Sequence, residues 1–299
     1  MITEDNGKYI DLHTHSMASD GSMTPAELVR HAFQSGLAAM ALTDHDTVAG
    51  VEEALEEGAR TGVEVIAGVE ISVSLSEWGF NPDEIEMHLL GYFFTDGYRS
   101  LQPVLEDLRR RREQRNPKII EKLNGMGIDI TMEEVAAKAP GGVVGRGHIA
   151  RVLMEKGYTA SVEEGFAKYL GTGKPAYVSK DKLTPEQGIA VILEAGGVPV
   201  LAHPVLLGLE RGQLPAVLER LKKAGLKGIE ALYSENTPEQ TRELLEVAEK
   251  TGLKVTGGSD FHGIFKPEIK IGTGRGNLKI PYRLLEELKD MQVMKKKYR

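Results

Sequence analysis

The chain has 299 residues, and its 37 lysines and arginines stand against 44 aspartates and glutamates, so the formal net charge is −7. It contains no cysteine, which excludes a disulfide scaffold, a thiolate zinc site and a cysteine nucleophile. No apolar run approaches the roughly 18–20 residues of a membrane span, and the N-terminus lacks the pattern of a secretory signal. These features predict a cytoplasmic globular protein whose acidic surface does not bind duplex DNA stably.

Short apolar runs alternate with amphipathic stretches at the start of the chain. Four such runs are predicted as strands, at residues 9–12, 39–43, 63–69 and 87–94. The first helix is predicted to begin at Thr24-Pro25, because threonine is a good N-cap and proline fits the first helical position. Gly36 marks the end of this helix, and a second helix is predicted over 48–60.

Between about residues 100 and 180 the chain shows helical periodicity without a convincing strand. Helices are predicted over 101–123, 132–139, 147–156 and 162–170. Glycine-rich segments separate them, as expected of loops. The sequence thus predicts a helical insertion (cap) domain over 100–180, within a barrel domain made of residues 1–99 and 181–299.

Strand–helix alternation resumes after residue 180. Further strands are predicted at 198–202, 228–232 and 254–256, with helices near 184–195, 214–224, 238–251 and 282–294. Near-continuous apolar strands followed by helices are typical of a parallel sheet covered on its faces. The predicted fold class is α/β, with a distorted (β/α)7 TIM-like barrel, and an open doubly wound sheet is the alternative. No Gly-x-Gly-x-x-Gly follows any strand, so a dinucleotide fold has no direct support.

Side chains that bind metals gather where the predicted strands end. The residues at these places are His13, His15, His45, Glu70, His203, Asp260 and His262, with His88 in the fourth run. The carboxyl ends of barrel strands meet at the active-site face. In His13-x-His15 and Asp260-x-His262 the paired residues point to the same side of an extended chain, so each pair can bind one ion. A single histidine at a strand end could be structural, but six in these places favour a metal centre suited to Zn, Fe or Mn.

Six motifs occur in order along the chain. They are Asp11-Leu-His13-Thr-His15-Ser with Asp20-Gly21, Thr43-Asp44-His45-Asp46, Gly68-Val-Glu70-Ile-Ser72, His88-Leu-Leu-Gly91-Tyr92, Ala202-His203-Pro204 and Gly258-Ser-Asp260-Phe-His262. In these motifs, residues 8–275 resemble the PHP (polymerase and histidinol phosphatase) family of metal-dependent phosphoesterases. The resemblance implies nine metal ligands, which are His13, His15, Asp20, His45, Glu70, His88, His203, Asp260 and His262.

The resemblance also implies how these residues share two or three divalent ions, whether manganese, zinc or iron. One ion is held by His13, His15, Glu70 and Asp260, a second by Glu70, His88 and His203, and a third by Asp20, His45 and His262. Three divalent ions outweigh three carboxylates, so the centre attracts anions. Metal ions lower the pKa of bound water, so the expected nucleophile is a metal-bridging hydroxide held by Glu70, with no protein nucleophile and no phosphoenzyme.

The helical insertion is expected to select the substrate through its basic residues. Predicted phosphate contacts are Ser72, Arg112, Arg146, His148 and Lys174. Arg112 belongs to an arginine-rich stretch that could instead be a solvated helix face. Arg146 begins a predicted helix whose N-terminal amides could help to hold phosphate, although Arg146 and His148 could equally be structural. Asp44 and Asp46 are expected to support the site without binding metal.

The arginine-rich insertion, with Gly-Arg-Gly-His-Ile-Ala at 145–150, is similar to one PHP branch. That branch contains nucleoside 3′,5′-bisphosphate phosphatases and 5′–3′ exoribonucleases, so the resemblance implies phosphorylated nucleotides or short single-stranded RNA or DNA as substrates. Histidinol-phosphate phosphatase is the alternative within the family, although its cationic substrate would call for acidic residues in the insertion. Two other classes stay open: a non-catalytic metal-binding PHP module, and a metal-dependent amidohydrolase, which would place a lysine on the fourth strand, where His88 stands.

Overall fold

The computed structural model describes residues 7–80, 85, 87–138, 145–178, 182–209 and 212–297, and for residues 111–113 and 292–297 it describes the backbone only. The chain forms two compact units. The barrel unit comprises Met1–Glu77, Ile85–Leu105 and Leu183–Arg299, and the helical unit comprises Trp78–Glu84 and Glu106–Lys182. No helix in the described ranges is both long and apolar enough to cross a membrane.

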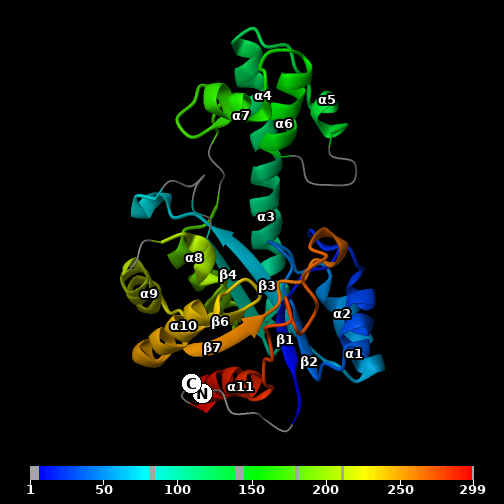
Figure 1. Cartoon of the computed structure of the whole chain (residues 1–299), viewed down its shortest axis with the longest axis vertical. Helices are drawn as coiled ribbons and strands as arrows, with labels where there is room; N and C mark the ends of the chain where they lie inside the picture. Colours follow the sequence, from blue (N-terminus) through cyan, green and yellow to red (C-terminus); the bar gives the residue numbers. More distant parts are fainter. Residues whose placement is uncertain are drawn as a thin grey trace. The chain divides into compact units, whose positions relative to one another are not determined.

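Seven strands of the barrel unit form a single sheet in which each strand pairs with the next along the chain (Figure 1). They are β1 (Ile10–Thr14), β2 (Ala39–Leu42), β3 (Glu64–Val73), β4 (Met87–Phe93), β5 (Val198–Leu201), β6 (Gly228–Tyr233) and β7 (Lys254–Gly258). The chain just after β7 also pairs with β1, since the amide of Asp260 donates to the carbonyl of His13, and the amide of His15 to that of Phe261, each over 2.9 Å. This approach needs Gly258, because a Cβ there would lie 2.1 Å from the Cβ of His13. The sheet is therefore nearly closed, and the predicted distorted seven-stranded TIM-like barrel is confirmed.

β4 departs from the predicted parallel arrangement, because it runs antiparallel to both β3 and β5. The remaining neighbouring strands are parallel, as predicted. A parallel return would need a crossover along the sheet, usually a helix, and the described residues between β3 and β4 hold only the short 3-10 helix η1 (Ser76–Trp78). The reversal brings the start of β4 beside the end of β3, so that His88 lies opposite Ser72.

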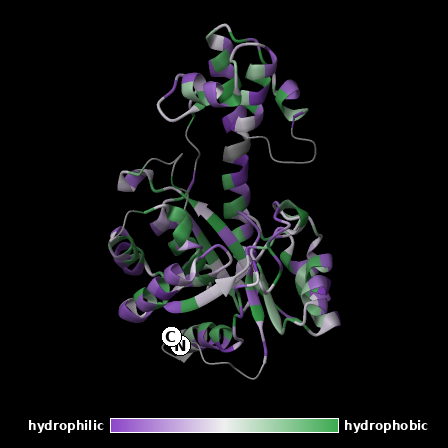
Figure 2. Ribbon diagram, in the orientation of Figure 1, coloured by the Kyte–Doolittle hydropathy of each residue, from purple (hydrophilic) through white to green (hydrophobic). Residues whose placement is uncertain are grey.

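Helices of the barrel unit pack around this sheet. They are α1 (Pro25–Gln34), α2 (Val51–Thr61), α8 (Pro185–Glu194), α9 (Gln213–Ala224), α10 (Pro238–Thr251) and α11 (Arg283–Lys297). α1, α8 and α10 begin with the same signal, a threonine N-cap followed by proline, and Thr24 accepts the amide of Glu27 as its predicted capping role requires. Figure 2 shows hydrophilic and hydrophobic residues on these helices, as expected of elements with one face on a sheet and the other in water. One buried cluster joins Leu12 and Tyr92 of the sheet to Leu285 of α11.

The helical unit has no strand among its described residues and has a core of its own. Its elements are the C-terminal part of α3 (Gln102–Glu113), α4 (Arg115–Gly125), α5 (Met132–Ala136), α6 (Arg146–Glu155), α7 (Val162–Gly165) and the π-helix η3 (Phe166–Leu170). The single helix predicted over 101–123 is instead two, α3 and α4, because Pro117 in the first turn of α4 has no amide to continue the hydrogen-bond ladder. Ile119, Leu123, Ile149 and Leu153 belong to its buried cluster.

Candidate metal centre

The nine residues predicted as metal ligands lie together at one edge of the barrel. They are His13 and His15 on and after β1, Asp20 in the loop that follows, His45 after β2, Glu70 on β3, His88 on β4, His203 after β5, and Asp260 and His262 after β7. This edge is formed by the carboxyl ends of the parallel strands, where barrel enzymes place their sites. His88 reaches it only because β4 is reversed, since a parallel β4 would begin at the opposite edge.

Glu70 lies at the centre of the cluster and is completely buried. Its Oε1 lies 2.9 Å from both His88 Nδ1 and His203 Nε2. Its Oε2 lies 3.1–3.2 Å from nitrogens of three further rings, those of His13, His15 and His45. One carboxylate thus faces two imidazoles with one oxygen and three with the other, which suits a residue that bridges two ions.

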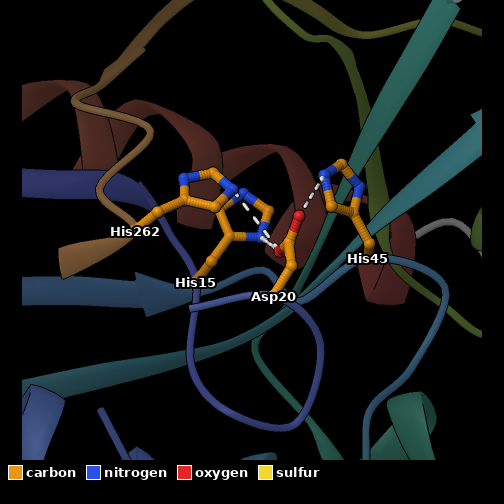
Figure 3. Close-up of side chains that lie close together, drawn as sticks. All are labelled: His15, Asp20, His45 and His262. Atoms are coloured by element: carbon orange, nitrogen blue, oxygen red, sulfur yellow. Dashed lines mark ion pairs between the residues drawn. The ribbon is translucent and has the colours of Figure 1, made fainter. Parts of the chain in front are cut away.

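Asp20 faces three imidazoles, as Figure 3 shows. Its Oδ1 lies 3.6 Å from His15 Nδ1 and 3.4 Å from His262 Nε2. Its Oδ2 lies 3.8 Å from His45 Nε2. The Asp20 side chain is half-exposed, whereas Glu70 is sealed from solvent. His15 therefore joins the group that the family resemblance assigned to Asp20, His45 and His262.

Asp260 divides its two oxygens between the cluster and partners outside it. Its Oδ1 lies 3.2 Å from His15 Nε2 and 3.6 Å from His13 Nε2. Its Oδ2 accepts hydrogen bonds from the Tyr233 hydroxyl at 3.1 Å and from the Lys266 ammonium at 2.7 Å. One oxygen faces the histidines while the other fixes the direction of the carboxylate.

The donor atoms of the cluster fit divalent ions. Within the described part of the chain, several buried atoms lack a hydrogen-bond partner, namely His13 Nε2, His15 Nδ1 and Nε2, His45 Nδ1 and Glu70 Oε2. A buried polar atom left without a partner costs about 1–3 kcal/mol, so this many in one place call for a ligand. The separations of 2.9–3.8 Å between carboxylate oxygens and ring nitrogens suit an ion, because two ligands about 2.1 Å from a metal lie about 3.0–3.4 Å apart.

These donors form four overlapping groups whose ligand atoms lie within 4.8 Å of one another. The groups are His15, Asp20, His45 and His262; His13, Glu70 and His203; His13, His15 and Asp260; and His45, Glu70 and His88. Each predicted ligand belongs to at least one group. The overlap means that neighbouring ions would share ligands.

Charges inside the cluster shift the protonation states of the metal-free chain. Burial lowers the pKa of His15, but the adjacent carboxylates of Asp260 and Glu70 outweigh burial and raise that pKa to about 9. Burial raises the pKa of Glu70, but the charges of His45 and His13 outweigh burial and hold that pKa well below its usual range. The protonated rings of His13 and His15 therefore neutralise the carboxylates until a metal displaces their protons.

The family model of the PHP domain matches residues 11–175. The chain belongs to the PHP family. Over 254 residues it is 36% identical to the 5′-3′ exoribonuclease Rnm of Escherichia coli, an alignment that covers 84% of each chain. Over 261 residues it is 32% identical to the 3′,5′-nucleoside bisphosphate phosphatase of Chromobacterium violaceum, covering 85% of this chain and 87% of that protein.

A solved structure of similar sequence shares the fold. It is an amidohydrolase from Chromobacterium violaceum with bound sulfate and no metal, 31% identical in sequence, and it superposes with a TM-score of 0.69 over 94% of this chain and 96% of that one. The family prediction is confirmed, and the chain is a metal-dependent PHP phosphoesterase that hydrolyses phosphate esters.

A buried glutamate that the sequence did not single out supports the PHP cluster. Glu230 on β6 accepts a hydrogen bond from His13 Nδ1 over 3.0 Å, and its other oxygen accepts the amide of His203 over 2.8 Å. Because a carboxylate can only accept, Nδ1 of His13 carries the hydrogen and Nε2 is left to face Glu70. Outer carboxylates of this kind orient metal-binding histidines. The available signal was a glutamate inside the otherwise apolar run 228–232.

Asp44 and Asp46 support the centre through hydrogen bonds, as predicted. Asp44 accepts the amide and hydroxyl of Ser16, next to His15. Asp46 accepts the amide and hydroxyl of Ser72. Ser72, a predicted phosphate contact, thus lies at the same edge of the sheet as the cluster, but it donates its hydroxyl hydrogen to Asp46.

Backbone strain also gathers at the PHP centre. Three non-glycine residues in the described ranges have positive φ, Asp46 at 51°, His203 at 23° and Asp260 at 57°. Two of them are predicted ligands and the third follows His45. Such conformations cost about 1–3 kcal/mol each and persist only where the surrounding structure imposes them. The site geometry is therefore held at the expense of stability.

In the helical unit, Arg146 has partners within that unit. Its Nη1 donates to the carbonyl of Leu170 over 3.0 Å, and its guanidinium lies over the rings of Phe166 and Tyr177. These contacts give Arg146 a structural role at the start of α6. Its predicted contact with phosphate stays a prediction.

The other predicted phosphate contacts of this unit differ in their surroundings. His148 accepts the amide of Gly145 on Nδ1 over 3.1 Å and so caps α6. Lys174 is exposed, and the side chain of Arg112 lies outside the described residues. Arg115, in the same arginine-rich stretch, is buried and donates from Nε to the carbonyl of Val178 over 2.8 Å. That stretch therefore contributes at least one structural residue.

Proposed function

We propose that this PHP enzyme binds two or three divalent ions, manganese, zinc or iron, through the nine clustered residues and hydrolyses phosphate esters of nucleotides or short oligonucleotides. Nucleoside 3′,5′-bisphosphates are the substrates of this kind that we favour. The observation that carries the proposal is the convergence of nine candidate ligand side chains, several of which have buried atoms without a hydrogen-bond partner. The names of two relatives, an exoribonuclease and a nucleoside bisphosphate phosphatase, support the substrate class.

When bound, the ions would supply an activated water molecule and neutralise charge on the phosphoryl oxygens. The role of the protein is to hold the metal-binding side chains in fixed positions. Glu70 offers both oxygens from a buried strand, Glu230 fixes the ring of His13, and Tyr233 with Lys266 fixes the carboxylate of Asp260. This rigidity limits the reorganisation that the reaction requires.

The phosphate contacts that we propose are Ser72 in the barrel unit and Arg112, Arg146, His148 and Lys174 in the helical unit. Residues 100–180 would act as the cap domain that selects the substrate. Cationic side chains suit a substrate with more than one phosphate. Histidinol phosphate carries an amine that the same side chains would repel, which is why it ranks second.

Metal analysis of the purified protein, combined with initial rates on three substrates, tests the proposal. The substrates are a nucleoside 3′,5′-bisphosphate, a 5′-phosphorylated short RNA and histidinol phosphate. We expect turnover of the first two, loss of turnover with a chelator, and recovery with manganese, zinc or iron. A preference for histidinol phosphate would reverse the substrate assignment. Bound metal without turnover of any of the three would favour a non-catalytic module.

A further inference from the structure

Large apolar side chains are exposed next to the metal centre. In the described part of the chain six such side chains are markedly exposed, and four of them follow a clustered histidine by two or three residues. These are Met17 after His15, Leu206 after His203, and Ile264 and Phe265 after His262. Exposed apolar groups that gather beside a polar site mark a binding surface more often than chance exposure.

The loop that carries Ile264 and Phe265 is fixed to the site at both ends. It is the 3-10 helix η5 (Gly263–Phe265) with Lys266 after it. The amide of Ile264 donates to Ser22 Oγ over 3.0 Å, and the ammonium of Lys266 donates to Asp260 Oδ2 over 2.7 Å. Phe265 stands between these two anchors, yet its side chain is 66% exposed. A phenyl ring held at this place and left in water has no evident role in packing.

Met17 lies on the loop that η5 contacts. The amide of Met17 donates to the carbonyl of Met23 over 2.7 Å, which closes this loop around Ser22. Gly263 has a φ of 69°, and a Cβ on it would lie 1.8 Å from Ser22 Oγ, so the two loops touch. The exposed side chains of Met17 and Ile264 therefore stand on two loops that touch, and we call these loops the rim of the cluster.

The ligand that matches this rim has two parts of different chemistry. The carboxylate–histidine cluster, once it holds divalent ions, would attract an anionic group, which the phosphoester supplies. The exposed ring and the apolar side chains beside it suit a flat group whose transfer from water is favourable. A sugar phosphate or histidinol phosphate offers the anion without a stacking face of this size, whereas a nucleotide offers both.

We propose that Phe265, with Ile264 and Met17 beside it, is the platform on which the nucleobase of the substrate stacks while its phosphoester lies at the Glu70-centred cluster. This inference rests on the proposed function, because it assumes a nucleotide substrate. Stacking on an aromatic side chain tolerates every base, since each base has a π-face. The platform therefore selects nucleotides over other phosphate esters without selecting a sequence.

The test compares Phe265→Ala with the wild-type chain on a nucleoside 3′,5′-bisphosphate and on the same sugar bisphosphate without its base. We expect kcat/KM on the nucleotide to fall about 5- to 140-fold, the range of one base–aromatic stack at 1.4 kcal/mol per tenfold. On the base-free compound we expect a change within about twofold, and Phe265→Trp should retain the nucleotide preference. Phe33→Ala is the matched control, because Phe33 is an exposed phenylalanine of the same unit in the last turn of α1, which leads to the start of β2.

Equal losses on the two compounds, or no loss on either, would overturn the platform while leaving the proposed function intact. A wild-type chain that hydrolyses the base-free compound at least as well as the nucleotide would overturn both. Metal content of Phe265→Ala is measured alongside, and we expect it to match the wild-type value because Phe265 is not among the clustered donors.

Discussion

The metal cluster of the barrel unit and the basic residues of the helical unit were both predicted from the sequence, but they differ in the bonding partners that the structure gives them. In the barrel unit the predicted side chains converge from distant parts of the chain, and several of their buried atoms lack a hydrogen-bond partner among the described residues. In the helical unit Arg146 and His148 already bond to groups of that unit, the carbonyl of Leu170 and the amide of Gly145. The first arrangement calls for a ligand, whereas Arg146 and His148 have partners without one.

This difference teaches which sequence signals carry function. Metal ligation restricts a position to a few residue types, so histidines and carboxylates at one strand end after another seldom occur together without a metal to bind. Arginine is common on helices and also serves to hold carbonyl groups and stack on rings. A basic residue in a helical insertion is therefore a weak predictor of phosphate binding until its partners are known.

The largest effect is expected from Glu70→Ala, which removes the central carboxylate of the metal cluster in the barrel unit. Its two oxygens face five imidazoles, so its loss removes a ligand from more than one ion. We expect metal retention to fall sharply and kcat to drop roughly 1000-fold or more. Glu64→Ala is the control, because Glu64 begins the same strand and pairs with Lys289 away from the cluster. Full metal content with normal turnover in Glu70→Ala would contradict the role of Glu70 as a shared metal ligand.

Glu230→Gln should have a smaller effect on the same centre. The amide can still accept a hydrogen bond from His13, but it carries no charge to hold the imidazole in its metal-binding orientation. We expect metal affinity to fall about 10- to 100-fold, as for other outer-sphere carboxylates, measured by competition with a chelator. Glu235→Gln is a matched control just beyond the same strand, where the carboxylate pairs with Arg275. A loss of thermal stability at unchanged metal affinity would assign Glu230 a structural role only.

The metal-free cluster should respond to pH in a way that the metal-bound cluster does not. The pKa of His15 is raised from 6.5 to about 9, so its ring holds a proton at pH 7 that a metal must displace. Apparent metal affinity should rise up to about tenfold per pH unit and per proton released, until pH reaches about 9. Calorimetry in two buffers with different ionisation enthalpies measures that release.

The same raised pKa has a consequence for the stability of the metal-free fold. The contribution of His15 is fully present below its unfolded pKa of 6.5 and is lost as pH rises from 6.5 to about 9. As pH rises over that interval, the melting temperature of metal-stripped protein should therefore rise less than that of metal-loaded protein, or fall. Identical pH profiles for the two forms would contradict the protonation states described for the cluster.

The smallest effects are expected in the helical unit. Arg146→Ala removes one hydrogen bond and two ring contacts, and should lower the free energy of unfolding by about 1–3 kcal/mol. His148→Ala removes one capping bond and should cost about 1 kcal/mol. Urea denaturation measures both. If Arg146 also holds phosphate, KM rises in Arg146→Ala and recovers in Arg146→Lys, and an unchanged KM in both variants would leave it structural.

Much of the barrel could be predicted because its signals are local. The apolar runs, the Thr24-Pro25 cap and the positions of the clustered histidines need only short stretches of chain. The direction of β4 could not be predicted from its composition, because a strand buried on both faces shows the same apolar pattern in either direction. The break at Gln114 within the predicted helix 101–123 had a signal in Pro117, but proline is also tolerated in a first helical turn.

The sequence alone determined the family, the seven strands and the identity of the residues that meet at the barrel edge, because metal chemistry limits which side chains can stand there. Only the tertiary structure decided that a reversed β4 delivers His88 to that edge, that Glu230 pairs with His13, and that Phe265 is held beside the cluster in water. The physical reason is that these features depend on contacts between residues far apart in the chain, and no local pattern encodes such a contact.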